Sequence, residues 1–85
     1  MDAGDPQELA TRLLDRALRL VREKDDSDWL QSSTVKSQMK RMDPSFSEKA
    51  LGYRSFSDFV KSRDVVAELD ETDPVRLIRL NPKGQ

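Results

Sequence analysis

Seven lysines and arginines in the middle of the chain are the side chains whose type and spacing most clearly allow chemistry. Residues 29–63 hold these seven cations against three carboxylates, a net charge of +4, while residues 1–28 carry −3 and residues 64–85 carry −2. Cations gathered in one segment bind phosphate groups with little dependence on base sequence. The alternative is that they form the solvent faces of short helices. The seven are Lys36, Lys40, Arg41, Lys49, Arg54, Lys61 and Arg63.

Tyr53 is the eighth candidate, for contact with a nucleic acid. Its ring follows Gly52 and could stack on a base, as aromatic side chains do in proteins that bind single strands. The other interpretation places the ring in the core and the hydroxyl at its edge, hydrogen bonded. The chain has five aromatic residues, and this scarcity favours the core for Tyr53. It favours the core more strongly for Trp29, Phe46, Phe56 and Phe59.

Catalytic chemistry has little support in this sequence. Histidine and cysteine are both absent, which removes the commonest general base, the commonest metal ligand and any disulfide. The clusters Asp25-Asp26-Asp28 and Asp70-Glu71-Asp73 lack the spacing of a calcium loop, and solvated loops are the better interpretation. No Walker-type or dinucleotide fingerprint is present. We therefore expect a binding module with no catalytic residue, no metal site and no cofactor.

The first predicted element is a long amphipathic helix. Asp5 is suited to cap it, Pro6 to begin it and Glu8 to complete a capping box, and the apolar spacing continues to about Lys24. The predicted apolar face consists of Leu9, Ala10, Leu13, Leu14, Ala17, Leu20 and Val21.

Two shorter helices are predicted next. Trp29 and Leu30 form a short apolar stretch, after which Ser33 can cap a helix that Asp43-Pro44 ends. In that helix the predicted inward residues are Val35, Met39 and Met42. A third, short helix is predicted from Ser47 to Leu51, where Gly52 supplies a left-handed end.

The remainder of the chain predicts a fourth helix and a β-hairpin. Ser55 caps a helix ending near Arg63, and residues 65–69 and 75–80 are two branched-residue runs around a polar tip. About four helices followed by a hairpin indicate an α+β winged helix-turn-helix, to which Trp29-Leu30 can add a third strand. At 85 residues this is one small domain. The acidic N-terminus and the lack of a long apolar run predict a cytoplasmic protein.

The chain resembles the LOTUS domain, also called OST-HTH, over roughly residues 29–80. The resemblance rests on Trp29-Leu30, on Asp43-Pro44-Ser45-Phe46, and most specifically on residues 51–62, LGYRSFSDFVKS, followed by the hairpin that ends Val75-Arg76-Leu77. Residues 1–28 are then expected to be the N-terminal helix of the same domain, and residues 81–85 a polar tail.

This resemblance implies a winged helix that binds RNA or protein. The family is associated with G-rich and G-quadruplex RNA, and the Trp29 form is similar to bacterial members C-terminal to NYN-type nuclease domains. An extended subclass adds a C-terminal helix and binds a DEAD-box RNA helicase of the Vasa type. This chain ends at Gln85 with Pro82 and Gly84 in its tail, so we expect the minimal form.

Our first hypothesis is an RNA-binding module that prefers G-rich or G-quadruplex RNA and targets a linked NYN-type nuclease. The alternative is a protein-interaction module that docks an RNA helicase or its own nuclease neighbour. The acidic predicted wing tip favours the alternative, since a wing that enters a groove is ordinarily basic. A DNA-binding repressor is a weaker third interpretation, because the short third helix has few side chains suited to reading bases.

Overall fold

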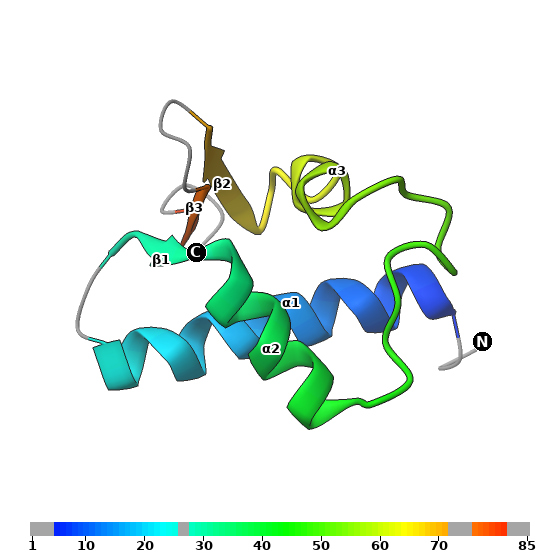
Figure 1. Cartoon of the computed structure of the whole chain (residues 1–85), viewed down its shortest axis with the longest axis horizontal. Coiled ribbons are helices and arrows are strands. Elements are labelled where there is room, and N and C mark those ends of the chain that lie inside the picture. Colours follow the sequence, from blue (N-terminus) through cyan, green and yellow to red (C-terminus); the bar gives the residue numbers. More distant parts are fainter. Residues whose placement is uncertain (1–4, 26–27, 72–75, 82–85) are drawn as a thin grey trace.

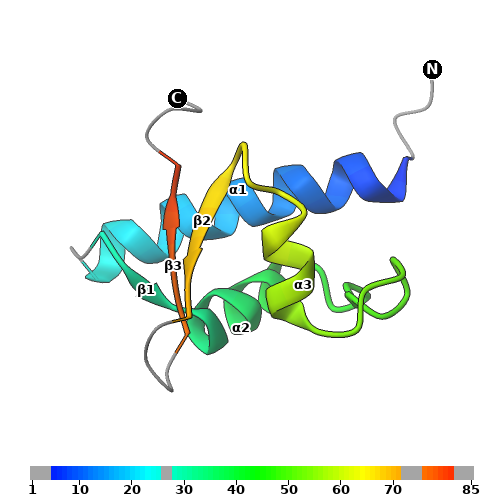
Figure 2. The ribbon, with the colours of Figure 1, turned by 90° about the horizontal axis from the view of Figure 1, so that it is seen from above.

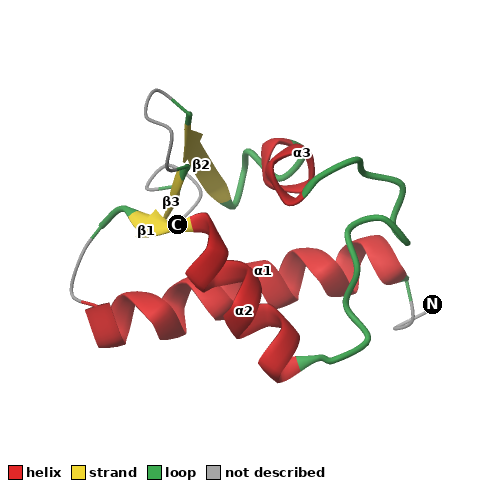
Figure 3. Ribbon diagram, in the orientation of Figure 1, coloured by secondary structure: helices red, strands yellow, loops and turns green. Residues whose placement is uncertain are grey.

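The computed structural model describes residues 5–25, 28–71 and 76–81. In these residues the chain forms three helices and a three-stranded antiparallel sheet, which makes it an α+β winged helix (Figures 1 and 3). The helices α1 and α2 cross in one layer, and the sheet lies with α3 in a second layer above them (Figures 1 and 2). The elements are α1 (Pro6–Asp25), β1 (Leu30–Gln31), α2 (Ser32–Met42), α3 (Phe56–Lys61), β2 (Ala67–Asp70) and β3 (Leu77–Leu80).

Helix α1 begins as predicted but turns a slightly different face to the core. The Asp5 carboxylate accepts a hydrogen bond from the Gln7 backbone N–H at 3.0 Å, which caps the helix. Leu9, predicted to face inward, is 47% exposed, whereas Leu18, absent from the predicted face, is fully buried. Because leucines surround much of this helix, the positions of α2 and the sheet decide which of them are covered. The buried residues are Ala10, Leu14, Ala17, Leu18 and Val21.

Helix α2 starts without the predicted serine cap. Its first residue is Ser32, and the preceding Gln31 makes no side-chain capping hydrogen bond, so the prediction that Ser33 caps the helix was wrong. The Ser32 backbone N–H instead donates to the carbonyl oxygen of Arg76 at 3.0 Å. The wing, which is the β2–β3 hairpin, therefore supplies a partner to a helix N–H group that a cap would ordinarily satisfy. Asp43 ends the helix, as predicted.

The sheet has the order β1-β3-β2, with both neighbours antiparallel. Ile78 of β3 pairs with Leu30 on one side and with Leu69 on the other, so the predicted third strand is present. Strand β2 begins two residues later than predicted. The backbone N–H groups of Val66 and Ala67 both donate to the carbonyl oxygen of Arg63, which keeps the chain in a turn after α3. The predicted tip and Val75 fall largely outside the described residues.

The core is centred on Phe59, which is fully buried. The rings of Phe46 and Tyr53 both lie 5.6 Å from the Phe59 ring in edge-on geometry, and Phe56 lies 5.9 Å from it. The prediction that the three phenylalanines are core residues is confirmed. Trp29 lies at the margin, half-buried, with the Arg79 guanidinium 4.7 Å above its ring.

Residues 43–55 form a loop between α2 and α3, drawn green in Figure 3. The helix predicted for residues 47–51 is absent, and this segment is a series of turns instead. The carbonyl oxygen of Glu48 accepts from the backbone N–H groups of Leu51 and Tyr53, at 3.2 and 3.0 Å, which closes the segment after one turn. Gly52 has a φ of 98°, the left-handed conformation predicted for it. Thus the described residues form three helices where about four were expected.

Among the described residues, no helix is long and apolar enough to cross a membrane.

Candidate nucleic-acid interface

The eight predicted RNA-binding residues come from three parts of the fold. Helix α2 carries Lys36, Lys40 and Arg41, and the loop after it carries Lys49, Tyr53 and Arg54. The last two, Lys61 and Arg63, lie at the end of α3 and just beyond it. The structure does not treat them alike, because some have their polar groups engaged within the fold and others do not.

Arg63 is fully engaged. Its Nε donates to the Thr11 hydroxyl at 2.6 Å, and one terminal nitrogen donates to the hydroxyls of Tyr53 and Ser62 at 2.9 and 2.7 Å. The other terminal nitrogen donates to the backbone and side-chain oxygens of Gln7, at 3.1 and 2.6 Å. A guanidinium has five N–H donors, and all five are used here. Arg63 therefore joins α1, the loop and the end of α3.

Tyr53 belongs to the same network. Its ring packs against Phe59, and its hydroxyl donates to the Gln7 side-chain oxygen at 3.1 Å while accepting from Arg63. Hydrogen bonds with Ser62 and Arg63 lower the pKa of Tyr53 below its ordinary value, because they stabilise the phenolate. This geometry agrees with the interpretation that places the ring at the edge of the core.

Lys61 is paired with the wing. Its Nζ lies 2.8 Å from a carboxylate oxygen of Glu71, and Arg76 lies 3.4 Å from the other oxygen. The hydrogen bond to Glu71 raises the pKa of Lys61 and in return lowers the pKa of Glu71. Part of the acidic character of the wing is thus neutralised by neighbouring cations.

Lys36 is paired with a buried acid. Its Nζ lies 3.0 Å from Oε2 of Glu48, which is 6% exposed. Burial raises the pKa of Glu48, but a backbone hydrogen bond at Glu48 and the nearby charges of Lys36 and Lys40 outweigh it, so the pKa is lowered. Glu48 is therefore paired with Lys36 and also interacts electrostatically with Lys40.

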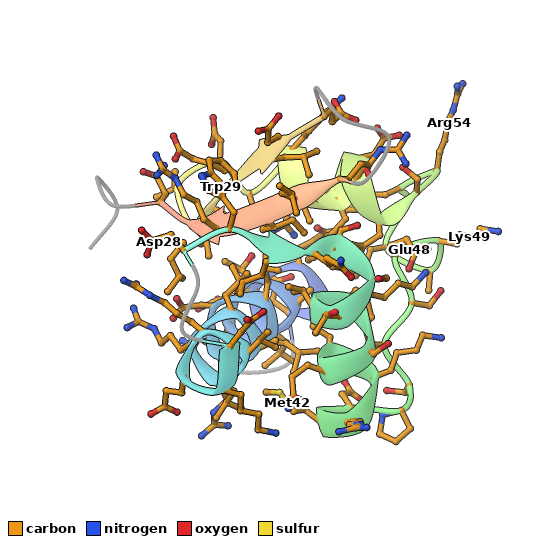
Figure 4. All side chains as sticks on the ribbon, turned by 60° about the vertical axis from the view of Figure 1, so that its left-hand side comes forward. Asp28, Trp29, Met42, Glu48, Lys49 and Arg54 are labelled. Carbon is orange, nitrogen blue, oxygen red and sulfur yellow. The ribbon has the colours of Figure 1, made fainter. Side chains whose placement is uncertain are left out.

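Three further cations of α2 and the loop have their charges open to solvent. Lys40, Lys49 and Arg54 are exposed and make no hydrogen bond or ion pair within the described part of the chain. Lys49 and Arg54 extend away from the body on one side of the molecule, and Trp29 lies on the opposite side (Figure 4). We call Lys36, Lys40, Lys49 and Arg54 the basic face.

Arg41 lies apart from the basic face. It lines a shallow groove of about 360 Å³ between α1 and α2, together with Val21 and Lys24. Its side chain is exposed, as are those of the other unpaired cations.

Sequence reasoning missed Gln7, Thr11 and Glu48. Gln7 and Thr11 lie on the first turns of α1 and carry no local signal of a contact with residues about 50 positions away. Glu48 falls within the helix predicted for residues 47–51, and no role was predicted for it. A carboxylate two residues after Phe46 and next to Lys49 carries no clear signal of burial in the sequence, and only the packing of the loop on α2 reveals it.

In the comparisons with known proteins, one family model matches this chain. The OST-HTH/LOTUS domain model matches residues 8–84, which is most of the chain. Domains of this family are non-catalytic modules that bind RNA or proteins. No significant match was found among curated proteins or among solved structures. The resemblance seen in residues 51–62 and the winged helix are thus both accounted for: this chain belongs to the OST-HTH/LOTUS family.

Proposed function

We propose that this domain binds RNA through its basic face. The observation that carries this proposal is that α2 and the loop after it carry these four cations, three of them exposed and without a partner in the described residues. Such cations can approach successive phosphates, and Lys49 and Arg54 extend away from the body (Figure 4). Arg63, Lys61 and Tyr53 contribute mainly by holding the loop and the wing in place.

We further propose that the preferred RNA is G-rich and structured, and that the domain targets a linked NYN-type nuclease to it. The association of the family with G-rich and G-quadruplex RNA supports the preference. The exposed ends of the basic face suit a compact, highly charged ligand. Lys49 and Arg54 follow turns that fix their backbone, so their spacing is set before RNA binds.

Fluorescence anisotropy of labelled RNA tests this proposal. The ligands are a G-rich RNA folded in potassium, the same RNA unfolded in lithium, and a control RNA without G runs. We expect the tightest binding to the folded RNA and a steep loss of affinity between low and physiological salt. Reversal of Lys40, Lys49 and Arg54 to glutamate should abolish the preference for the folded RNA without unfolding the domain. Absence of binding to all three RNAs at low salt contradicts the proposal.

A second candidate function is protein docking, and one observation favours it. A groove of about 390 Å³ runs between the first turns of α1 and the loop. It is lined mainly by apolar side chains, which include the exposed Leu9, the partly buried Leu13 and the buried Phe46. An apolar groove of this kind suits a partner such as an RNA helicase or the nuclease neighbour. Docking there should depend little on salt, and Leu9→Asp should weaken it while leaving RNA affinity unchanged.

A further inference from the structure

Glu48 is the one polar or charged residue that is buried among the residues described, with 6% of its surface exposed. Burial of a carboxylate is costly unless opposite charges and hydrogen bonds compensate it. The compensation comes from the basic face itself, since Lys36 lies 3.0 Å away and Lys40 acts on the same carboxylate. The acid therefore lies behind the surface that we propose for RNA.

The backbone of Glu48 holds the loop that presents two further cations. Its carbonyl oxygen accepts from the N–H groups of Leu51 and Tyr53, which are close in sequence to Lys49 and Arg54. Figure 4 shows Glu48 between α2 and the outward side chains of Lys49 and Arg54. Glu48 thus pairs with α2 through its side chain and closes the turn of the loop through its backbone.

The ion pair reduces what Lys36 can offer to a phosphate. Charges of opposite sign held 3.0 Å apart largely cancel at longer distances. RNA affinity and its salt dependence grow with the number of cations that replace counterions on phosphates. With Glu48 ionised, the basic face carries a net charge of about +3 instead of +4.

We propose that Glu48 sets the strength of RNA binding by neutralising Lys36 within the basic face. This inference rests on the proposed RNA-binding function and adds a residue that limits it. In a purely structural role, Glu48 would only anchor the loop, and every change to it would weaken binding. The two roles predict opposite signs for a variant that removes the charge and keeps the shape.

A cycle of three variants separates these roles, measured by RNA anisotropy over a salt series. Glu48→Gln keeps an oxygen to accept from Lys36 but removes the negative charge, so affinity should rise about three- to tenfold, with a salt slope steeper by about 0.7. Lys36→Gln leaves the acid uncompensated and should weaken binding. In the double variant an uncharged pair replaces an ion pair, so the net charge of the basic face is the same. Its RNA affinity should stay within about twofold of that of the original chain.

Glu68→Gln is the matched control. Like Glu48, Glu68 is paired with a cation, in this case Arg79. Arg79 stacks on Trp29, on the side away from Lys49 and Arg54. The control makes the same change in net charge, and RNA affinity should stay within about twofold. A rise equal to that of Glu48→Gln would attribute the effect to net charge and overturn the proposal.

Folding is checked for each variant by circular dichroism and thermal unfolding. Unchanged or weaker binding by a folded Glu48→Gln variant overturns the proposal. If that variant does not fold, the double variant decides, because its two amides can hydrogen bond to each other; a loss above tenfold contradicts the inference. If the original chain binds no RNA at low salt, the proposed function itself fails, which is a distinct outcome.

Discussion

Arg54 and Arg63 lie nine residues apart and have the same side chain, yet the fold uses them in opposite ways. All five donors of Arg63 are accepted by groups of α1, the loop and Ser62. Arg54 extends into solvent and has no partner among the described residues (Figure 4). The difference shows that formal charge does not measure how well a side chain can bind a ligand. That capacity depends on how many of its hydrogen-bond donors have no partner within the fold.

The largest effect we expect is from Arg63→Ala. The change removes five hydrogen bonds and the contact with the Phe59 ring, and should lower the free energy of unfolding by about 3 kcal/mol. For a domain of this size the melting temperature should fall by on the order of 15 °C. Thermal unfolding measures this fall in melting temperature. Arg54→Ala is the matched control and should change stability by less than about 0.5 kcal/mol. Equal losses of stability in the two variants would contradict the contrast between Arg63 and Arg54.

The next effect concerns RNA affinity. The double reversal Lys49→Glu/Arg54→Glu should weaken RNA binding by about tenfold or more, because two phosphate contacts become repulsive. The melting temperature should hardly change. Arg12→Glu/Arg19→Glu makes the same change in net charge on the exposed side of α1 and should alter affinity by less than about twofold. Equal weakening by both pairs would indicate a non-specific charge effect.

Tyr53→Phe sharpens the description of the Arg63 network. The ring keeps its packing on Phe59, but the hydroxyl that joins Gln7 and Arg63 is lost. We expect the melting temperature to fall by about 5 °C and RNA affinity to remain as it was. An unchanged melting temperature would show that water replaces the hydroxyl at no cost.

The smallest effect is the dependence of stability on pH at Glu48. Its pKa is lowered in the folded state, so the ion pair stabilises the domain at neutral pH. That contribution is lost as the pH falls through the ordinary glutamate range toward the folded pKa. The difference in melting temperature between the original chain and Glu48→Gln should therefore shrink from pH 7 to about pH 3. A difference independent of pH contradicts this account.

The fold could be predicted because its signals are local. The Asp5 and Ser55 caps, the Asp43-Pro44 stop and the change to branched residues after α3 each act over a few residues. The failures have one cause. Leu9, Ser33 and residues 47–51 depended on what other elements cover or supply, such as the Arg76 carbonyl that replaces the cap of α2.

The site was predictable only as a list of charges. The sequence contains the seven cations, but nothing local distinguishes Arg63, which contacts Gln7 and Thr11 across more than 50 residues, from Arg54. Glu48 escaped notice for the same reason, since its partner is 12 residues away on another element. Whether a charged side chain is available to a ligand is therefore decided by tertiary packing.

Strand β1 passes into α2 without a linker, and this has a mechanical consequence. Gln31 pairs with Leu77 in the sheet, and the next residue is the first of the helix. The Ser32 N–H adds a further bond to the strand side of the wing. A force applied to α2 therefore reaches the central strand with no slack segment to absorb it. A tilt of α2 would therefore displace β1, and through the pairing of β1 with β3 it would displace the wing as well.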